Sequence, residues 1–156
     1  MKIRIEVPAD RRKLGWLTIV GTPFGCVCYL KADNAAAAKS GNPTRDPTRR
    51  NGDTPLGTYR AVVGKAYAWS PRTYGPYRVV RLEPTGGDAL TAKRNGRSGL
   101  LIHGGDLASD GRSLRPTHGC VRVSNYHQAA LLVYLDASGE AEHQLEIVPM
   151  KEVENG

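Results

Sequence analysis

The sequence predicts a mainly β domain, a β-sandwich or open barrel, packed against one helix in the C-terminal half. Three observations predict this class. Segments with strand character outnumber those with helical spacing, 18 glycines and 10 prolines separate these segments, and only one long segment has a helical apolar pattern. A length of 156 residues with 40% hydrophobic residues suits one domain. We expect this domain to cover residues 1–150, followed by an acidic tail at 151–156.

Seven segments have the alternation or the β-branched and aromatic content that strands favour. We expect strands at Lys2–Val7, Leu17–Val20, Cys26–Leu30, Thr58–Val63, Tyr77–Leu82, Leu100–His103 and Gln144–Val148. A turn is expected at residues 84–87, one helical turn at Ala35–Lys39, and a long polar loop at Lys39–Pro55.

The one long helix is expected to begin at Asn125, which can cap its first turn. Gln128 follows three residues later, as in a capping box, and Gly139 is expected to end the helix. The apolar face predicted from the spacing contains Ala129, Ala130, Val133 and either Leu132 or Leu135.

The charge is unevenly distributed and favours an anionic partner. The net charge is +7, but residues 1–135 carry 21 basic and 9 acidic side chains, a net charge of +12. Solubility explains such a charge equally well. The sequence contains no nucleic-acid-binding motif and no run of 18 apolar residues, so we expect neither nucleic acid binding nor stable membrane insertion.

The three cysteines differ in their setting. Cys26 and Cys28 lie two residues apart in a predicted strand, so they share one face and are expected to be small core residues. Cys120 instead follows a histidine and a glycine in a polar, glycine-rich segment. Burial of a small thiol does not explain that setting.

Two strand-like pieces, Gly99–His103 and Cys120–Val123, flank a polar loop, so pairing between them would bring His103 toward Cys120. A cysteine nucleophile reacts as its thiolate, which is scarce at neutral pH because the ordinary thiol pKa is about 8.5. A neighbouring imidazole either takes the thiol proton or pairs with the thiolate as imidazolium.

Other groups nearby suit the same chemistry. Arg112, Arg115 and Arg122 are expected to favour the anionic sulfur, and Gly119 to let the backbone expose N–H groups as an oxyanion hole. Two alternatives stay open. One is a buried cysteine and an unrelated histidine, and the other is a zinc site of His103, His118 and Cys120. The zinc site is disfavoured because no Asp or Glu stands ready as a base, so we expect no metal and no cofactor.

At these residues the sequence resembles the L,D-transpeptidase (YkuD-type) catalytic domain. That family carries a His-Gly pair, a loop, and then Ser or Thr followed by His-Gly-Cys, matched here by His103-Gly104 and by Thr117-His118-Gly119-Cys120-Val121-Arg122. The upstream segment Asp53-Thr54-Pro55-Leu56-Gly57-Thr58-Tyr59 is similar to the family's Thr-Pro-Thr-Gly segment. Leu56 and Thr117 replace the commoner Thr and Ser of the family.

The resemblance implies the family's β-sandwich-like fold and cysteine-dependent acyl transfer on peptidoglycan stem tetrapeptides. Cys120 would attack the carbonyl between the diamino acid and D-Ala, and the thioester would then pass to an amine, giving a 3–3 crosslink or exchange of D-Ala. His103 would accept and return the proton, with the Gly104 carbonyl orienting its ring. His118 and Gly119 would shape the pocket and, with the Cys120 N–H, the oxyanion hole. Thr117 and Arg122 would bind substrate, a structural ion pair being the alternative for Arg122.

The resemblance also implies a periplasmic or extracellular cell-wall location. No signal peptide is visible at residues 1–7, so we expect either a missing leader or leaderless secretion. Two other functions remain open. The same site could serve an L,D-carboxypeptidase, including a secreted effector that damages the walls of competitors, and the chain could be a non-enzymatic basic module that binds an anionic polymer.

Overall fold

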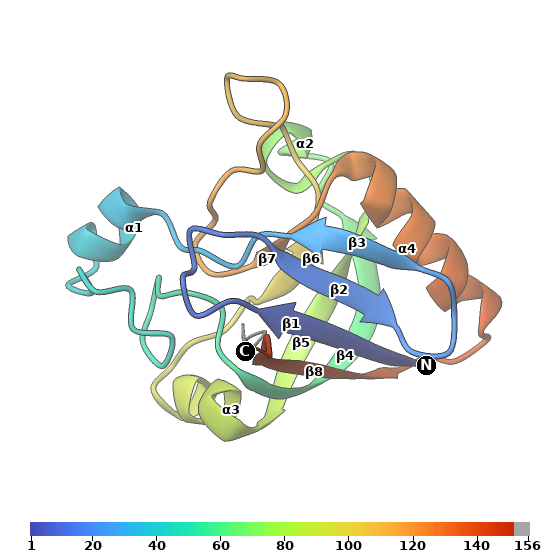
Figure 1. Cartoon of the computed structure of the whole chain (residues 1–156), viewed down its shortest axis with the longest axis horizontal. Coiled ribbons are helices and arrows are strands. Elements are labelled where there is room, and N and C mark those ends of the chain that lie inside the picture. Colours follow the sequence, from blue (N-terminus) through green and yellow to red (C-terminus); the bar gives the residue numbers. More distant parts are fainter. Residues whose placement is uncertain (152–156) are drawn as a thin grey trace, which may run out of the picture.

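The computed structural model describes residues 1–151, which form one curved sheet with helices around it (Figure 1). Its strands are β1 (Lys2–Val7), β2 (Gly15–Ile19), β3 (Gly25–Cys28), β4 (Gly57–Ala66), β5 (Arg78–Gly86), β6 (Leu101–His103), β7 (Val121–Arg122) and β8 (His143–Pro149). Its helices are α1 (Asn34–Lys39), α2 (Pro71–Tyr74), α3 (Gly87–Arg94) and α4 (Asn125–Ala137). The predicted acidic tail lies, apart from Lys151, outside the described residues.

The sheet is nearly closed into a barrel. Its strand order is β3-β2-β1-β8-β4-β5-β6-β7, and among the strands of residues 1–151 only β1 with β8 and β6 with β7 pair in parallel. Tyr29, directly after β3, exchanges two backbone hydrogen bonds with Arg122 of β7, at 2.8 and 3.0 Å. Because these bonds join the two ends of the strand order, few backbone groups are left at an open edge. The mainly β prediction is confirmed.

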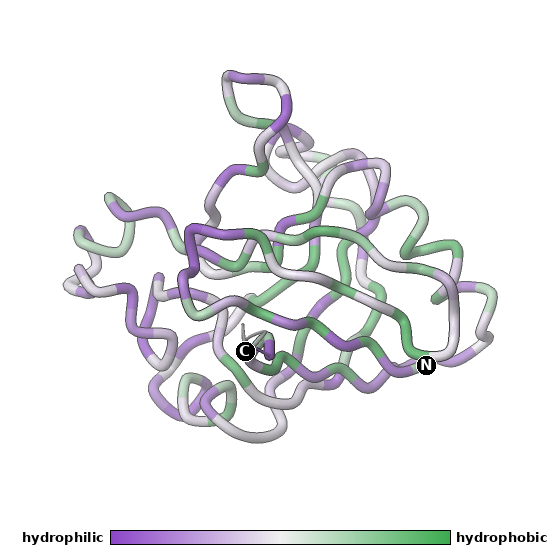
Figure 2. Tube along the Cα trace, viewed as in Figure 1, coloured by the Kyte–Doolittle hydropathy of each residue, from purple (hydrophilic) through white to green (hydrophobic). Residues whose placement is uncertain are grey.

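Alternation along the strands builds the core. Ile3 and Ile5 of β1 are fully buried, as are Leu17 and Ile19 of β2, while the residues between them are partly exposed. The central strands therefore alternate between hydrophobic and hydrophilic residues (Figure 2). The predicted core positions Cys26 and Cys28 are both buried. None of the helices within residues 1–151 has the length and apolar character needed to cross a bilayer.

Each predicted strand is present, with ends that differ by a few residues, and the short helix α1 and the long loop after it are confirmed. The turn predicted at residues 84–87 is wrong. Pro84 lies within β5 opposite Tyr59, next to a bulge at which Thr85 of β5 has no partner on β4, and such a position tolerates a proline, which has no N–H. Gly87, at φ 67°, starts α3 directly after the strand.

Helix α4 is present, but three details of its prediction are wrong: the N-cap, the capping box and the position of Val133. Its N-cap is Ser124, whose side chain accepts from the His127 N–H, and Asn125 is the first helical residue. Gln128 forms no capping box, because its buried amide donates to the carbonyls of Arg78 and Ile102. The buried face consists of Gln128, Leu131, Leu132 and Leu135, while Val133 is 67% exposed. The helix ends near Gly139, as predicted.

Candidate active site

The pairing of β6 with β7 brings His103 and Arg122 side by side and places Cys120, two residues before Arg122 in the chain, next to them. Ile102 pairs with Val121 and His103 with Arg122, so Cys120 lies beside Leu101 at the start of β7. Because side chains alternate between the two faces of a strand, Cys120 and Arg122 share a face with Leu101 and His103. Cys120 and His103 are diagonal neighbours on that face, a spacing that long and aromatic side chains can bridge.

His103 is held in one orientation and in its neutral form. Its side chain is 2% exposed, and its Nδ1 lies 2.6 Å from the Gly104 carbonyl oxygen. Since a carbonyl only accepts, Nδ1 carries the proton and Nε2 is free to accept one. Burial lowers the pKa of His103 to about 4, with the Gly104 hydrogen bond opposing this and Arg122 adding to it. The imidazole is therefore neutral at neutral pH, with its Nε2 unprotonated.

Cys120 is half-buried and protonated at rest. Its Sγ donates to the Gly99 carbonyl at 3.6 Å. Burial raises the pKa of Cys120 to about 11, although a backbone hydrogen bond from Leu101 and the charges of Arg97 and Arg122 pull it down. These pKa directions favour a neutral thiol beside a neutral imidazole. Of the two arrangements that the sequence allows, the one in which histidine takes the thiol proton is favoured.

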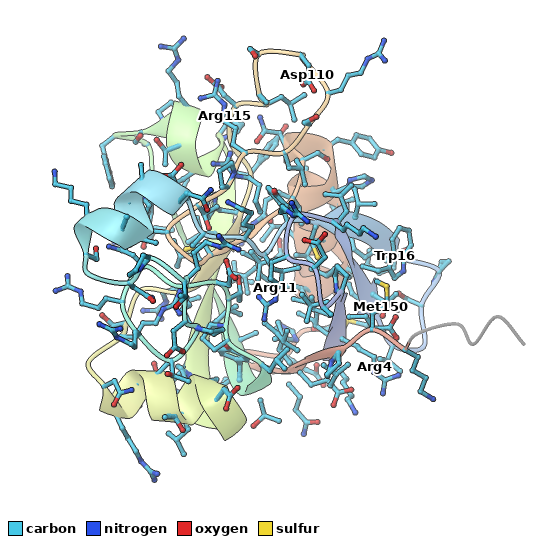
Figure 3. All side chains as sticks on the ribbon, turned by 60° about the vertical axis from the view of Figure 1, so that its left-hand side comes forward. Arg4, Arg11, Trp16, Asp110, Arg115 and Met150 are labelled. Carbon is cyan, nitrogen blue, oxygen red and sulfur yellow. The ribbon has the colours of Figure 1, made fainter. Side chains whose placement is uncertain are left out.

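The arginines around Cys120 differ from the predicted set. Arg97 and Arg122 lower the thiol pKa, whereas Arg112 and Arg115 are exposed and do not contribute. Arg115 donates from Nε to the Leu107 carbonyl at 2.8 Å. Figure 3 shows Asp110 toward the tip of the projecting loop before Thr117, and Arg115 closer to its base. The expectation that Arg112 and Arg115 stabilise the anionic sulfur is wrong for this reason.

The loop before Cys120 is held together by Thr117. The Thr117 hydroxyl donates to the Cys120 carbonyl at 2.8 Å and accepts from the Gly119 N–H at 2.9 Å. The Gly119 N–H is therefore occupied, and cannot serve the predicted oxyanion hole at the same time. No acceptor for the Cys120 N–H is found among residues 1–151. The occupied, buried hydroxyl of Thr117 favours a structural role over the predicted contact with substrate.

The upstream segment contacts this loop directly. Thr54 is fully buried, and its hydroxyl lies 2.8 Å from the Gly119 carbonyl and 3.2 Å from the Leu30 carbonyl. Asp53 accepts from the Ala32 N–H at 2.8 Å and from Arg45 Nε at 3.3 Å. The two sequence motifs, more than 60 residues apart, thus form one hydrogen-bonded unit around the cysteine.

Arg97 is a site residue that the sequence did not reveal. It is 5% exposed, and its guanidinium donates to the carbonyls of Asp53, Gly52, Pro47 and His118. It fixes the loop after α1 against the His-Gly-Cys loop and places a positive charge near Cys120. No local pattern separates Arg97 from the exposed arginines of the chain, because its role depends on carbonyls that only the fold brings together.

Arg122 and His118 have different surroundings. Arg122 is 4% exposed, and its Nη1 donates to the Asp106 carbonyl at 3.3 Å, while its buried Nε has no partner within the described part of the chain. No carboxylate of residues 1–151 forms an ion pair with Arg122, so the structural alternative predicted for it is not seen there. His118 is exposed and contributes its carbonyl to Arg97.

Aromatic side chains cover the His103 end of the site. The rings of Tyr74 and His103 lie 5.1 Å apart, and Tyr67 and Trp69 pack against Tyr74 at 4.7 and 5.4 Å. Trp69 is 76% exposed. These residues lie in α2 or in the segment just before it. Within residues 1–151, no three His, Cys, Asp or Glu side chains are grouped to hold a metal ion, so the alternative zinc site is not formed there.

Known proteins provide an independent comparison. The fold is similar to that of Bd1075 from Bdellovibrio bacteriovorus (TM-score 0.54, 16% identity, 98% of this chain and 50% of that chain). It is also similar to the helical cell shape determining protein Pgp2 from Campylobacter jejuni (TM-score 0.55, 16% identity, 97% of this chain and 49% of that chain). At this identity the likeness concerns the fold alone, and the chain spans about half the length of these proteins.

No curated protein matches the sequence. The family YkuD, L,D-transpeptidase catalytic domain, matches residues 7–142, which include β6, β7 and all the site residues described above. On this match the chain belongs to the YkuD family of L,D-transpeptidase catalytic domains.

Proposed function

We propose that this protein is a cysteine L,D-transpeptidase that acts on peptidoglycan stem tetrapeptides, at the bond between the diamino acid and D-Ala. The observation that carries the proposal is that a half-buried thiol and a neutral imidazole occupy diagonal positions on neighbouring strands, with Nδ1 of His103 fixed by the Gly104 carbonyl at 2.6 Å. Membership in the YkuD family supports peptidoglycan as the partner. Because that polymer lies outside the cytoplasm, the protein would act in the periplasm or cell wall.

Acylation follows from the protonation states. Nε2 of His103 accepts the proton of Cys120 Sγ as the sulfur attacks the scissile carbonyl. The Cys120 N–H, which has no acceptor within residues 1–151, donates to the developing oxyanion in this proposal. The carbon–nitrogen bond then breaks, the amine of D-Ala takes the proton from His103, and a thioester remains on Cys120.

Deacylation reverses the proton flow. An amine of a second stem attacks the thioester and loses its proton to His103, which passes it to the departing sulfur of Cys120. A new peptide bond forms and the thiol is restored. Water in place of the amine gives a tripeptide, so a site that admits water more readily than an amine is an L,D-carboxypeptidase.

The test is incubation with purified tetrapeptide muropeptides, followed by mass spectrometry. We expect D-Ala release with dimers from the unaltered protein and no product from Cys120→Ala. A carbapenem should add its mass to Cys120 and to neither Cys26 nor Cys28, which are buried. Equal product from Cys120→Ala would refute the proposal, and tripeptides without dimers would reassign the protein as a carboxypeptidase. Salt-sensitive polymer binding without any product would point to the non-enzymatic basic module.

A further inference from the structure

A hollow of about 300 Å³ lies on the face of the sheet beside the candidate active site. It extends over β4, β5 and the start of β6, and its walls include Arg60, Tyr67, Arg81, Glu83, Gly99 and Leu101. Arg60, Arg81 and Glu83 are exposed residues of alternating strand positions, so they project from the outer face of the sheet.

The hollow adjoins the nucleophile through shared backbone. The Gly99 carbonyl in its wall accepts from Cys120 Sγ at 3.6 Å, and Leu101, also in its wall, hydrogen-bonds the same sulfur through its backbone. Leu101 pairs directly with Arg81 of β5. A peptide bound in the hollow would therefore pass Gly99 and reach Cys120, which is one strand spacing away.

Of the two arginines in the wall of the hollow, Arg81 is the one without an ion-pair partner among residues 1–151. Arg60 pairs with Glu142 at 3.2 Å, and Glu83 pairs with Lys93. Arg81 has no carboxylate within 4 Å among residues 1–151, and its stem lies across Gly64, where an added Cβ would come within 3.3 Å of Arg81 Cγ. Arg81 is thus an exposed guanidinium that can bind an incoming carboxylate in two-point fashion.

The proton transfers proposed for His103 determine in which orientation the substrate peptide lies across the site. Both the leaving amine and the attacking amine exchange a proton with Nε2 of His103, so both must lie toward the His103 end of the face. The acyl part of the substrate must then extend from Cys120 in the other direction. Gly99 and the part of the hollow that it lines lie there, on the side of Leu101 opposite to His103.

We propose that this hollow binds the acyl part of the donor stem peptide, and that Arg81 binds a carboxylate of stem residue two or three. The inference rests on the proposed function for the identity of the peptide. Arg81 is then a specificity residue that selects acidic stems, and it takes no part in the proton transfers.

The experiment measures binding in a Cys120→Ala background, so it does not require turnover. The probes are a stem tetrapeptide with free carboxylates and the same peptide with carboxamides at residues two and three. Adding Arg81→Gln should weaken binding of the carboxylate peptide about fivefold and leave binding of the carboxamide peptide unchanged. Arg78→Gln is the matched control, since Arg78 lies on the same strand but pairs with Asp136 outside the hollow.

The outcomes separate the two proposals. A loss confined to the carboxylate peptide and to Arg81→Gln supports the hollow as the donor subsite, even if the unaltered protein releases no D-Ala. Equal effects of Arg81→Gln on both peptides, no effect on either, or the same loss with Arg78→Gln would overturn the inference. In those cases Cys120-dependent release of D-Ala would still uphold the proposed function.

Discussion

Oδ1 of Asn125 accepts a hydrogen bond from the Gly105 N–H at 2.8 Å, next to the carbonyl that orients His103. The contact is close, since a Cβ added to Gly104 would lie 2.2 Å from the same oxygen. The first residue of α4 thus fixes the peptide that holds the imidazole. Asn125 does not touch the reacting atoms, so it is a positioning residue.

We predict that Asn125→Asp keeps the activity but moves its acid limb to higher pH. The carboxylate still accepts from the Gly105 N–H, and its negative charge favours the imidazolium, which raises the pKa of His103. Asn125→Ala loses the acceptor and should lower kcat by about tenfold. The measurement is kcat/KM for D-Ala release against pH. Tyr126→Glu adds the same charge at an exposed neighbouring position, and an equal shift there would contradict the assignment.

The protonation states predict a broad pH profile for the unaltered enzyme. Activity needs a neutral imidazole and a protonated thiol, so kcat/KM should fall below the His103 pKa of about 4 and above the Cys120 pKa of about 11. Alkylation of Cys120 by iodoacetamide should accelerate by about tenfold per pH unit between pH 7 and 9, because only the thiolate reacts. A fast rate that does not change over this range would indicate a resting thiolate–imidazolium pair instead.

Burial of neutral His103 also makes folding pH-dependent. The folded pKa of about 4 lies below the ordinary value of 6.5, so the unfolded chain binds more protons between these values. The free energy of unfolding should therefore fall as the pH drops from 6.5 to 4, by up to about 3 kcal/mol from this residue. Urea denaturation across this range measures the slope. His103→Gln should flatten it, and an unchanged slope would mean that His103 is not the group responsible.

Gly119→Ala should abolish activity and destabilise the protein strongly. At φ 109° an added Cβ would lie 1.7 Å from Arg97 Nη2 and 2.6 Å from the Gly52 carbonyl, so the loop around Cys120 has to move. Gly111→Ala is the control: it has φ 70° but nothing within 4 Å, and it should cost only the backbone strain of about 1 kcal/mol. Thermal unfolding and D-Ala release measure both effects. If Gly119→Ala lost no more stability and activity than Gly111→Ala, the loop around Cys120 would accommodate the added Cβ, and the prediction would be wrong.

Arg97→Met should destabilise the protein by about 3 kcal/mol and lower the acylation rate. The change leaves buried carbonyls without donors and removes a charge that lowers the Cys120 pKa. Arg94→Met, on an exposed residue of α3, should change neither property. The acylation rate is measured by carbapenem adduct formation on variants confirmed to be folded. A stable, fully reactive Arg97→Met would refute this role.

The sequence predicts what is encoded locally. Lys2–Val7 alternates cleanly and forms β1, and His103-Gly104 and His118-Gly119-Cys120 fall on paired strand ends because both motifs flank one loop. The failures in helix α4 have two different causes. Ser124 and Asn125 are both good caps, so the sequence does not choose between them. The apolar spacing predicts Val133 on the buried face and Gln128 in a capping box, whereas Gln128 is buried and Val133 is exposed. The Gln128 amide is buried because the carbonyls of Arg78 and Ile102 accept from it.

The backbone pairing of Tyr29 with Arg122 has a consequence for the order of assembly. The reactive loop is joined to residues about 90 positions earlier in the chain, and such long-range closures are entropically expensive and form slowly. The nucleophile should therefore become competent only after the rest of the barrel has closed. A peptide copied from residues 98–125 alone would carry every reactive group of the site without the chemistry.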